Sequence, residues 1–177
     1  MKKILLSLLA ISAITTAAFA GNPAEKHIGY NYVTLGEETG HGVGFGADYM
    51  VPVFEAHGVK GLEMGLGVNF DVTALDTTVN STTSSMIYGG DLEALVGYRY
   101  QDFNVRGGVG YDMTVVADSA YLHGVVFSAS AGYEFTENWL FEVSYTVAND
   151  MSLESAGTST GADIDKETVG FNLVWKN

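Results

Sequence analysis

The chain has 177 residues, no cysteine and a formal net charge of −13. This acidity argues against nucleic acid as a partner and against binding to an anionic surface by charge. Because disulfides are excluded, an exported chain of this size needs either a real apolar core or a membrane to stabilise it.

The first twenty residues have the layout of a secretory signal peptide. Lys2-Lys3 precedes an apolar run from Ile4 to Ile14, and small residues then lead to Ala18-Phe19-Ala20. The run is shorter than the roughly 20 residues that a membrane helix needs. We therefore expect cleavage after Ala20, which removes two lysines and leaves 21–177 as one domain with a net charge of −15.

The rest of the chain alternates between apolar and polar residues with a period of two, which is typical of β-strands. This pattern predicts eight strands, at 27–35, 42–51, 60–74, 86–100, 104–116, 123–134, 139–149 and 167–175. Their lengths match the about 9–11 residues with which a tilted strand crosses a bilayer. Helices and closed barrels are the two structures that satisfy the backbone in lipid, so these strands predict a barrel.

The connections between the predicted strands fall into two sets. Those after the fourth and sixth strands are tight, whereas 75–85 and 150–166 are long and rich in Thr, Ser, Gly and Asp. Short periplasmic turns and longer extracellular loops are typical of outer-membrane barrels. We expect both termini in the periplasm, and loops 75–85 and 150–166 as the mobile surface through which an extracellular ligand would bind.

The two faces of the strands decide whether the barrel is soluble or in a membrane. A soluble lipocalin-like binder would point its apolar face inward. Here the apolar faces are bulky and nearly free of charge, whereas the other faces carry mainly Gly, Ser, Asn and Thr, which suits a narrow lumen. We expect the apolar faces outward, with Phe141, Val143, Tyr145, Phe171 and Leu173 among them.

At this point the chain resembles the OmpA/OmpX-type outer-membrane barrels and the related porin-opacity proteins. The resemblance covers 26–177 and depends mainly on the strand pattern. Gly132–Trp139 is similar to the turn before the penultimate strand of that group, and Phe171-x-Leu173-x-Trp175 is similar to its C-terminal assembly signal, although Lys176-Asn177 follows here. The resemblance implies an all-β, eight-stranded antiparallel up-and-down transmembrane barrel, closed by its first and last strands. It also implies a Gram-negative outer membrane, with outer-membrane lipids and the assembly machinery as partners.

The inward charges predict a lumen with two levels. With the turn placed at 101–104, Arg99 stands opposite Arg106 near the periplasmic end. These two arginines need carboxylates around them. Flanking strands supply them at similar height, so the sequence predicts a salt-bridge plug of Arg99, Arg106, Glu63, Glu134 and Glu142, with Asp48 as a further candidate.

The same register places Glu93 opposite Asp112, with Asp91 close by, higher in the lumen. No basic partner is predicted there, and confined like charges repel one another. We expect an acidic vestibule of Asp91, Glu93 and Asp112, open to the outside, which attracts water and a cation above the plug. On this basis Arg99→Ala with Arg106→Ala would open a cation-preferring leak.

The sequence offers little for catalysis. Lipid A deacylase barrels use a His and a Ser two apart on one strand, and none of the four histidines here has such a serine. The histidines are also too scattered for a metal site. We expect a non-enzymatic protein without metal or cofactor, with a role in envelope integrity or surface interaction and at most a narrow cation-preferring leak. The alternatives are a lipid-modifying enzyme on the same barrel and a soluble periplasmic binder.

Overall fold

The computed structural model describes residues 24–54, 60–76, 85–117, 120–155 and 158–176. The expected signal peptide lies outside these residues. These residues contain no helix long and apolar enough to cross a membrane.

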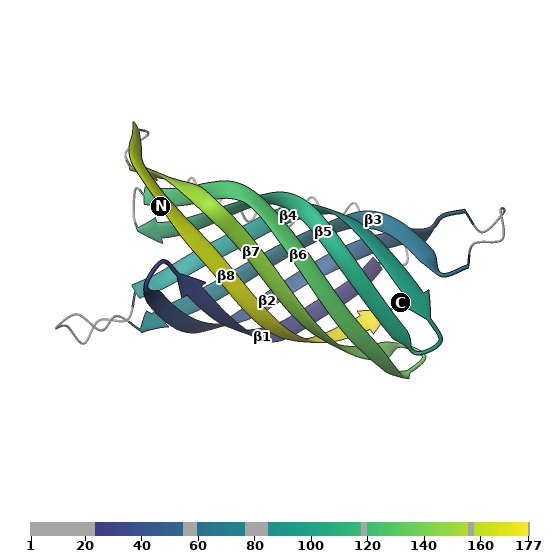
Figure 1. Ribbon diagram of the computed structural model, residues 1–177. Coiled ribbons are helices and arrows are strands. Elements are labelled where there is room, and N and C mark those ends of the chain that lie inside the picture. Colours follow the sequence, from purple (N-terminus) through teal and green to yellow (C-terminus); the bar gives the residue numbers. More distant parts are fainter. Residues whose placement is uncertain (1–23, 55–59, 77–84, 118–119, 156–157, 177) are drawn as a thin grey trace.

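Eight antiparallel strands form one closed ring in chain order (Figure 1). They are β1 (Ala24–Leu35), β2 (Glu38–Pro52), β3 (Leu62–Asp76), β4 (Ser85–Tyr100), β5 (Phe103–Ala117), β6 (Ala120–Thr136), β7 (Trp139–Ser155) and β8 (Thr158–Lys176). The predicted strand number and the closure by first and last strands are confirmed.

The ring closes where β1 pairs with β8, from Glu25 opposite Lys176 to Leu35 opposite Lys166. The start of β1 and the end of β8 therefore lie at one end of the barrel, called here the terminal end. The turn between β1 and β2 lies at the opposite end, called here the far end.

The apolar faces point outward, as predicted. The five residues of β7 and β8 that were predicted to point outward have exposed fractions of 39–47%: Phe141, Val143, Tyr145, Phe171 and Leu173. Exposed aromatic side chains also gather near the terminal end, including Tyr100, Phe103, Tyr133, Phe135, Trp139 and Trp175. Bulky apolar side chains thus cover the outside of the barrel, which is the reverse of the lipocalin-like alternative, and polar and charged residues fill much of the interior.

The predicted register between β4 and β5 is wrong by two residues. Tyr100 pairs with Phe103 around the two-residue turn Gln101-Asp102, so Arg106 lies opposite Gly97 and Asp91 lies opposite Asp112. The turn is shorter than predicted because Gln101 adopts a positive φ of 52°. A shift of two residues leaves every side chain on its predicted face, since side chains alternate with a period of two.

The predicted loop at 150–166 is wrong. Residues 150–155 continue β7 and residues 158–166 continue β8, and both strands extend beyond their neighbours at the far end of the barrel (Figure 1). The register shifts between Ala148 and Met151 and again between Ser152 and Glu154, and Asp150 and Gly161 have positive φ. These bulges interrupt the alternation from which strands are predicted. In the other predicted loop, Leu75 and Asp76 belong to β3 and Ser85 to β4, while 77–84 lies outside the described residues.

Candidate functional site

Arg99 lies in the lumen near the terminal end and contacts three carboxylates. Its guanidinium lies 2.7 Å from Glu25 and 3.2 Å from Glu63, and it also donates to Glu134. Lys176, at the end of β8, contacts the second oxygen of Glu134 at 2.5 Å. The ion pairs connect β1, β3, β4, β6 and β8 across the lumen.

Arg106 lies deeper, with its side chain 4% exposed. It donates to Asp48 at 2.9 Å and to Glu25, and Glu142 lies 3.7 Å away. Glu142 also accepts a hydrogen bond of 3.0 Å from Ser130. Glu25 thus holds both arginines, one with each carboxylate oxygen.

The structure brings all five predicted plug residues into one set of contacts, together with Asp48, Glu25 and Lys176. This set is called the charged network below. The sequence prediction missed Glu25 because the first strand was taken to start at residue 27. The inward alternation of Asn31, Gly29 and His27 extends back to Glu25 and could have identified it.

The three predicted vestibule residues lie in the middle of the lumen. Asp91 accepts a hydrogen bond of 2.7 Å from Asn69, and Glu93 accepts one from Ser128. Asp112 is 2% exposed and contacts a lysine that the sequence prediction did not place there.

This lysine is Lys166, at 4% exposure. Its ammonium lies 2.9 Å from both Asp112 and Thr114 and 3.4 Å from Asp71. The prediction that the upper carboxylates have no basic partner is therefore wrong. Lys166 was assigned to a loop, whereas the extension of β8 places its side chain inside the barrel.

Inward-facing glycines make room for these charges. A Cβ on Gly89 would collide with the carboxylate of Asp71 and would lie 2.7 Å from the Lys166 ammonium. A Cβ on Gly108 would collide with the carboxylate of Glu93. The glycines on the inner face thus relieve crowding in a narrow lumen, as the sequence indicates.

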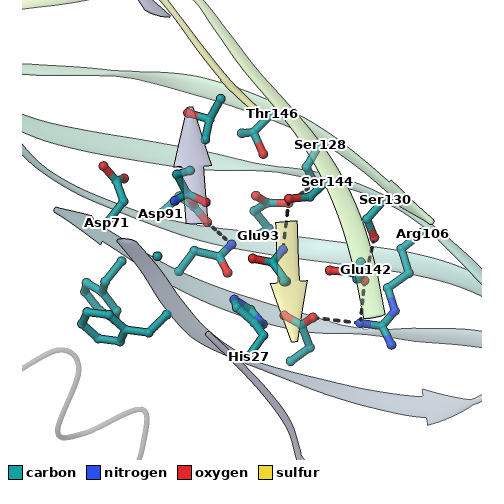
Figure 2. A pocket seen from close by; sticks show the side chains of 18 of the residues that line it. His27, Asp71, Asp91, Glu93, Arg106, Ser128, Ser130, Glu142, Ser144 and Thr146 are labelled. Atoms are coloured by element: carbon teal, nitrogen blue, oxygen red, sulfur yellow. Dashed lines mark hydrogen bonds and ion pairs between the residues drawn. The ribbon is translucent and has the colours of Figure 1, made fainter. Parts of the chain in front are cut away.

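A cavity of about 90 Å³ lies between the two charged levels. Figure 2 shows Asp71 and Asp91 toward one side, Glu142 and Arg106 toward the other, and Glu93 between them. A volume of this size can hold several water molecules. Carboxylates outnumber basic groups among its lining residues, so its interior favours cations over anions.

An apolar layer fills the lumen on the far side of Lys166. Its buried members are Val33, Leu75, Ile87, Leu122, Val126, Ala148 and Met151, with Leu35 and Val116 contacting both halves. Ile87, Leu122 and Met151 are fully buried. The vestibule is therefore not open to the outside, and that part of the prediction is also wrong.

His123 lies close to a serine, but its ring nitrogens are engaged by other residues. Ser152 lies directly opposite His123 across the β6–β7 pair. The two ring nitrogens of His123, however, contact Tyr111 and Glu154, and no hydrogen bond to Ser152 is present in the described part of the chain. The same residues contain no group of three or more His, Asp and Glu side chains that could hold a metal ion.

The C-terminal residues Phe171, Leu173 and Trp175 lie on the outer wall of β8. Trp175 stacks on Trp139 with ring centroids 6.2 Å apart, and the ammonium of Lys26 lies 4.7 Å from its ring. Trp175 therefore lies at the closing seam of the barrel, where β1 meets β8.

No protein-family profile and no curated protein sequence matches the chain. Several solved structures, however, have a similar fold. Neisserial surface protein A has 11% identity and a TM-score of 0.63, with 87% of this chain and 97% of that chain covered. Ail, the attachment invasion locus protein of Yersinia pestis, has 11% identity and a TM-score of 0.54 over the same shares. The outer membrane protein AlkL has 13% identity and a TM-score of 0.56, covering 88% of this chain and 90% of that chain.

These likenesses establish the fold, and the chain has the features that the fold requires: a closed ring of eight long strands, an apolar outer wall and a polar lumen. The chain therefore has the fold of the eight-stranded outer-membrane β-barrels of the OmpA/OmpX type.

Proposed function

We propose that the protein is a non-enzymatic outer-membrane barrel with a closed lumen, which acts through its outer wall and its extracellular end in envelope integrity or surface interaction. The observation that carries this proposal is the double closure of the lumen. The charged network fills one end, and the apolar layer fills the other. Eight strands leave an interior about wide enough for side chains alone.

The barrel orientation is part of the proposal. The terminal end faces the periplasm and the far end faces outward, as in bacterial barrels with an even number of strands. Within the described residues, the extended ends of β7 and β8 are then the most prominent extracellular surface, and residues 158–163 are exposed along it. In this proposal the leader directs export and is removed after Ala20.

Recordings of the purified protein in planar bilayers test the closed lumen. We expect almost no conductance from the wild-type barrel. Any residual current should prefer cations, because carboxylates are in excess around the cavity. A large, steady pore, or one that prefers anions, would rule out the proposal.

We also propose that Phe171, Leu173 and Trp175 are read by the outer-membrane assembly machinery. Trp175→Gln should lower the yield of barrel in the outer membrane, while refolding in detergent persists, because the seam retains its backbone pairing. Heat-modifiable gel mobility of outer-membrane fractions measures this yield. Trp139→Gln is the matched control, since it removes the stacked partner of Trp175 without changing β8. Equal yields from the two variants would contradict the assigned role.

A further inference from the structure

A cluster of Tyr, His and acidic side chains lies on the outer wall near the far end of β1, β2 and β3. Tyr30 on β1 contacts Nδ1 of His41 on β2 through its hydroxyl. The other ring nitrogen of His41 lies 3.8 Å from Asp76 on β3. Tyr32 lies directly opposite His41, with the ring centroids 5.3 Å apart.

A second cluster has the same arrangement on β5, β6 and β7. The hydroxyl of Tyr111 on β5 lies 2.5 Å from Nδ1 of His123 on β6, and Nε2 of His123 lies 3.2 Å from Glu154 on β7. Tyr121 lies beside His123 and donates to Glu154. In both clusters three consecutive strands supply Tyr, His and acid in that order, and the histidine is the fourth residue of its strand.

Both clusters continue the lipid-facing wall. Tyr30 and Tyr111 have exposed fractions of 47% and 48%, and apolar residues of the same outer face lie on the membrane side of each. Aromatic side chains with a polar group are typical of the level where hydrocarbon gives way to headgroups. The two clusters therefore lie against the headgroups of the outer leaflet, given the orientation proposed above.

We propose that the two Tyr–His–acid clusters bind the sugar rings of glycolipid headgroups in the outer leaflet. This assignment rests on the proposed membrane orientation. A sugar presents C–H groups that pack on a tyrosine ring and hydroxyls that donate to a carboxylate, whose oxygens each accept more than one hydrogen bond. Each cluster offers these groups side by side, so one headgroup can bind on each side of the barrel.

The charges select the sugar rather than a phosphate. Each cluster contains a carboxylate, which repels phosphate. The basic side chains of the described chain lie elsewhere: Lys26, Lys60 and Lys176 at the terminal end, and Arg99, Arg106 and Lys166 in the lumen. A neutral, hydroxyl-rich ring fits both clusters without a cationic partner.

Histidine NMR on the mature protein in phospholipid nanodiscs tests the proposal. Adding a dephosphorylated diglucosamine glycolipid should shift the imidazole resonances of His41 and His123. The resonances of His27, which lines the lumen cavity, should stay in place. The same titration gives the apparent affinity. Tyr30→Leu with Tyr111→Leu should weaken it at least about fivefold, the scale expected for loss of an aromatic contact.

Two further variants complete the test. Tyr98→Leu with Tyr133→Leu removes two tyrosines of similar exposure from the same outer wall, and should leave the affinity unchanged. Asp76→Asn with Glu154→Gln keeps all rings and should also weaken binding. Equal affinity in all variants, equal shifts with phospholipid alone, or binding only to the phosphorylated glycolipid would overturn the proposal. Failure of the folded barrel to enter any bilayer would instead reject the membrane function and this assignment together.

Discussion

Lys166→Met should lower the free energy of unfolding by about 3 kcal/mol, the scale measured when one partner of a buried ion pair is removed. The ammonium of Lys166 is the basic group that contacts Asp112 and Asp71 in the lumen. Without it, Asp112 and Asp71 keep their hydrogen bonds from Thr114 and Thr73 but have no opposite charge in contact. Urea unfolding in detergent micelles, followed by tryptophan fluorescence, measures the loss.

Two comparisons test whether charge is the cause. Lys60→Met changes an exposed lysine just before β3 and should leave stability unchanged. Adding Asp112→Asn and Asp71→Asn to Lys166→Met should recover much of the lost stability, because the two carboxylates that Lys166 contacts are then replaced by neutral amides. If the triple variant were no more stable than Lys166→Met, packing and not charge would explain the loss.

The conductance of the barrel should depend on both closures of the lumen. Because the apolar layer closes the lumen separately, Arg99→Ala with Arg106→Ala should leave the barrel closed, contrary to the expectation from sequence. Adding Ile87→Ser and Leu122→Ser removes two fully buried members of that layer. The fourfold variant should then pass cations through the carboxylate-lined cavity, as planar-bilayer recordings would show.

Ile87→Ser with Leu122→Ser alone is the matched control. It should also stay closed, since the charged network remains intact. A cation current from either double variant would show that a single layer closes the lumen. An anion-selective current from the fourfold variant would contradict the excess of carboxylates around the cavity.

The sequence predicted the outer wall well because lipid imposes a strict rule on it. A one-residue error would move every side chain of a strand to the opposite face and place charges in lipid. Phe141 and Leu173 could therefore be assigned without knowing the turns. The register between β4 and β5 could not be predicted from the alternation, because it depends on the length of one turn. Its error of two residues kept Arg99 and Arg106 in the lumen but changed their cross-strand partners.

The upper lumen was mispredicted because several of its residues lie beyond the predicted strand ends. Leu75 and Met151 fell in predicted loops, and Leu122 preceded the sixth predicted strand. Bulges in β7 and β8 hid the alternation that would have carried both strands further. The position of Lys166 inside the lumen was missed for the same reason. The apolar layer and its neighbouring ammonium depend on strand length and on bulges, which period-two alternation does not reveal.

The even number of strands has a practical consequence for engineering. The chain enters and leaves the ring at the same end, with Glu25 opposite Lys176, while the turn at Gly36-Glu37 lies at the opposite end. In the proposed orientation, a domain fused after Lys176 would stay on the periplasmic side. An epitope inserted between Gly36 and Glu37 would be displayed to antibodies outside the cell. One barrel could thus carry cargo in two compartments without any change to its wall.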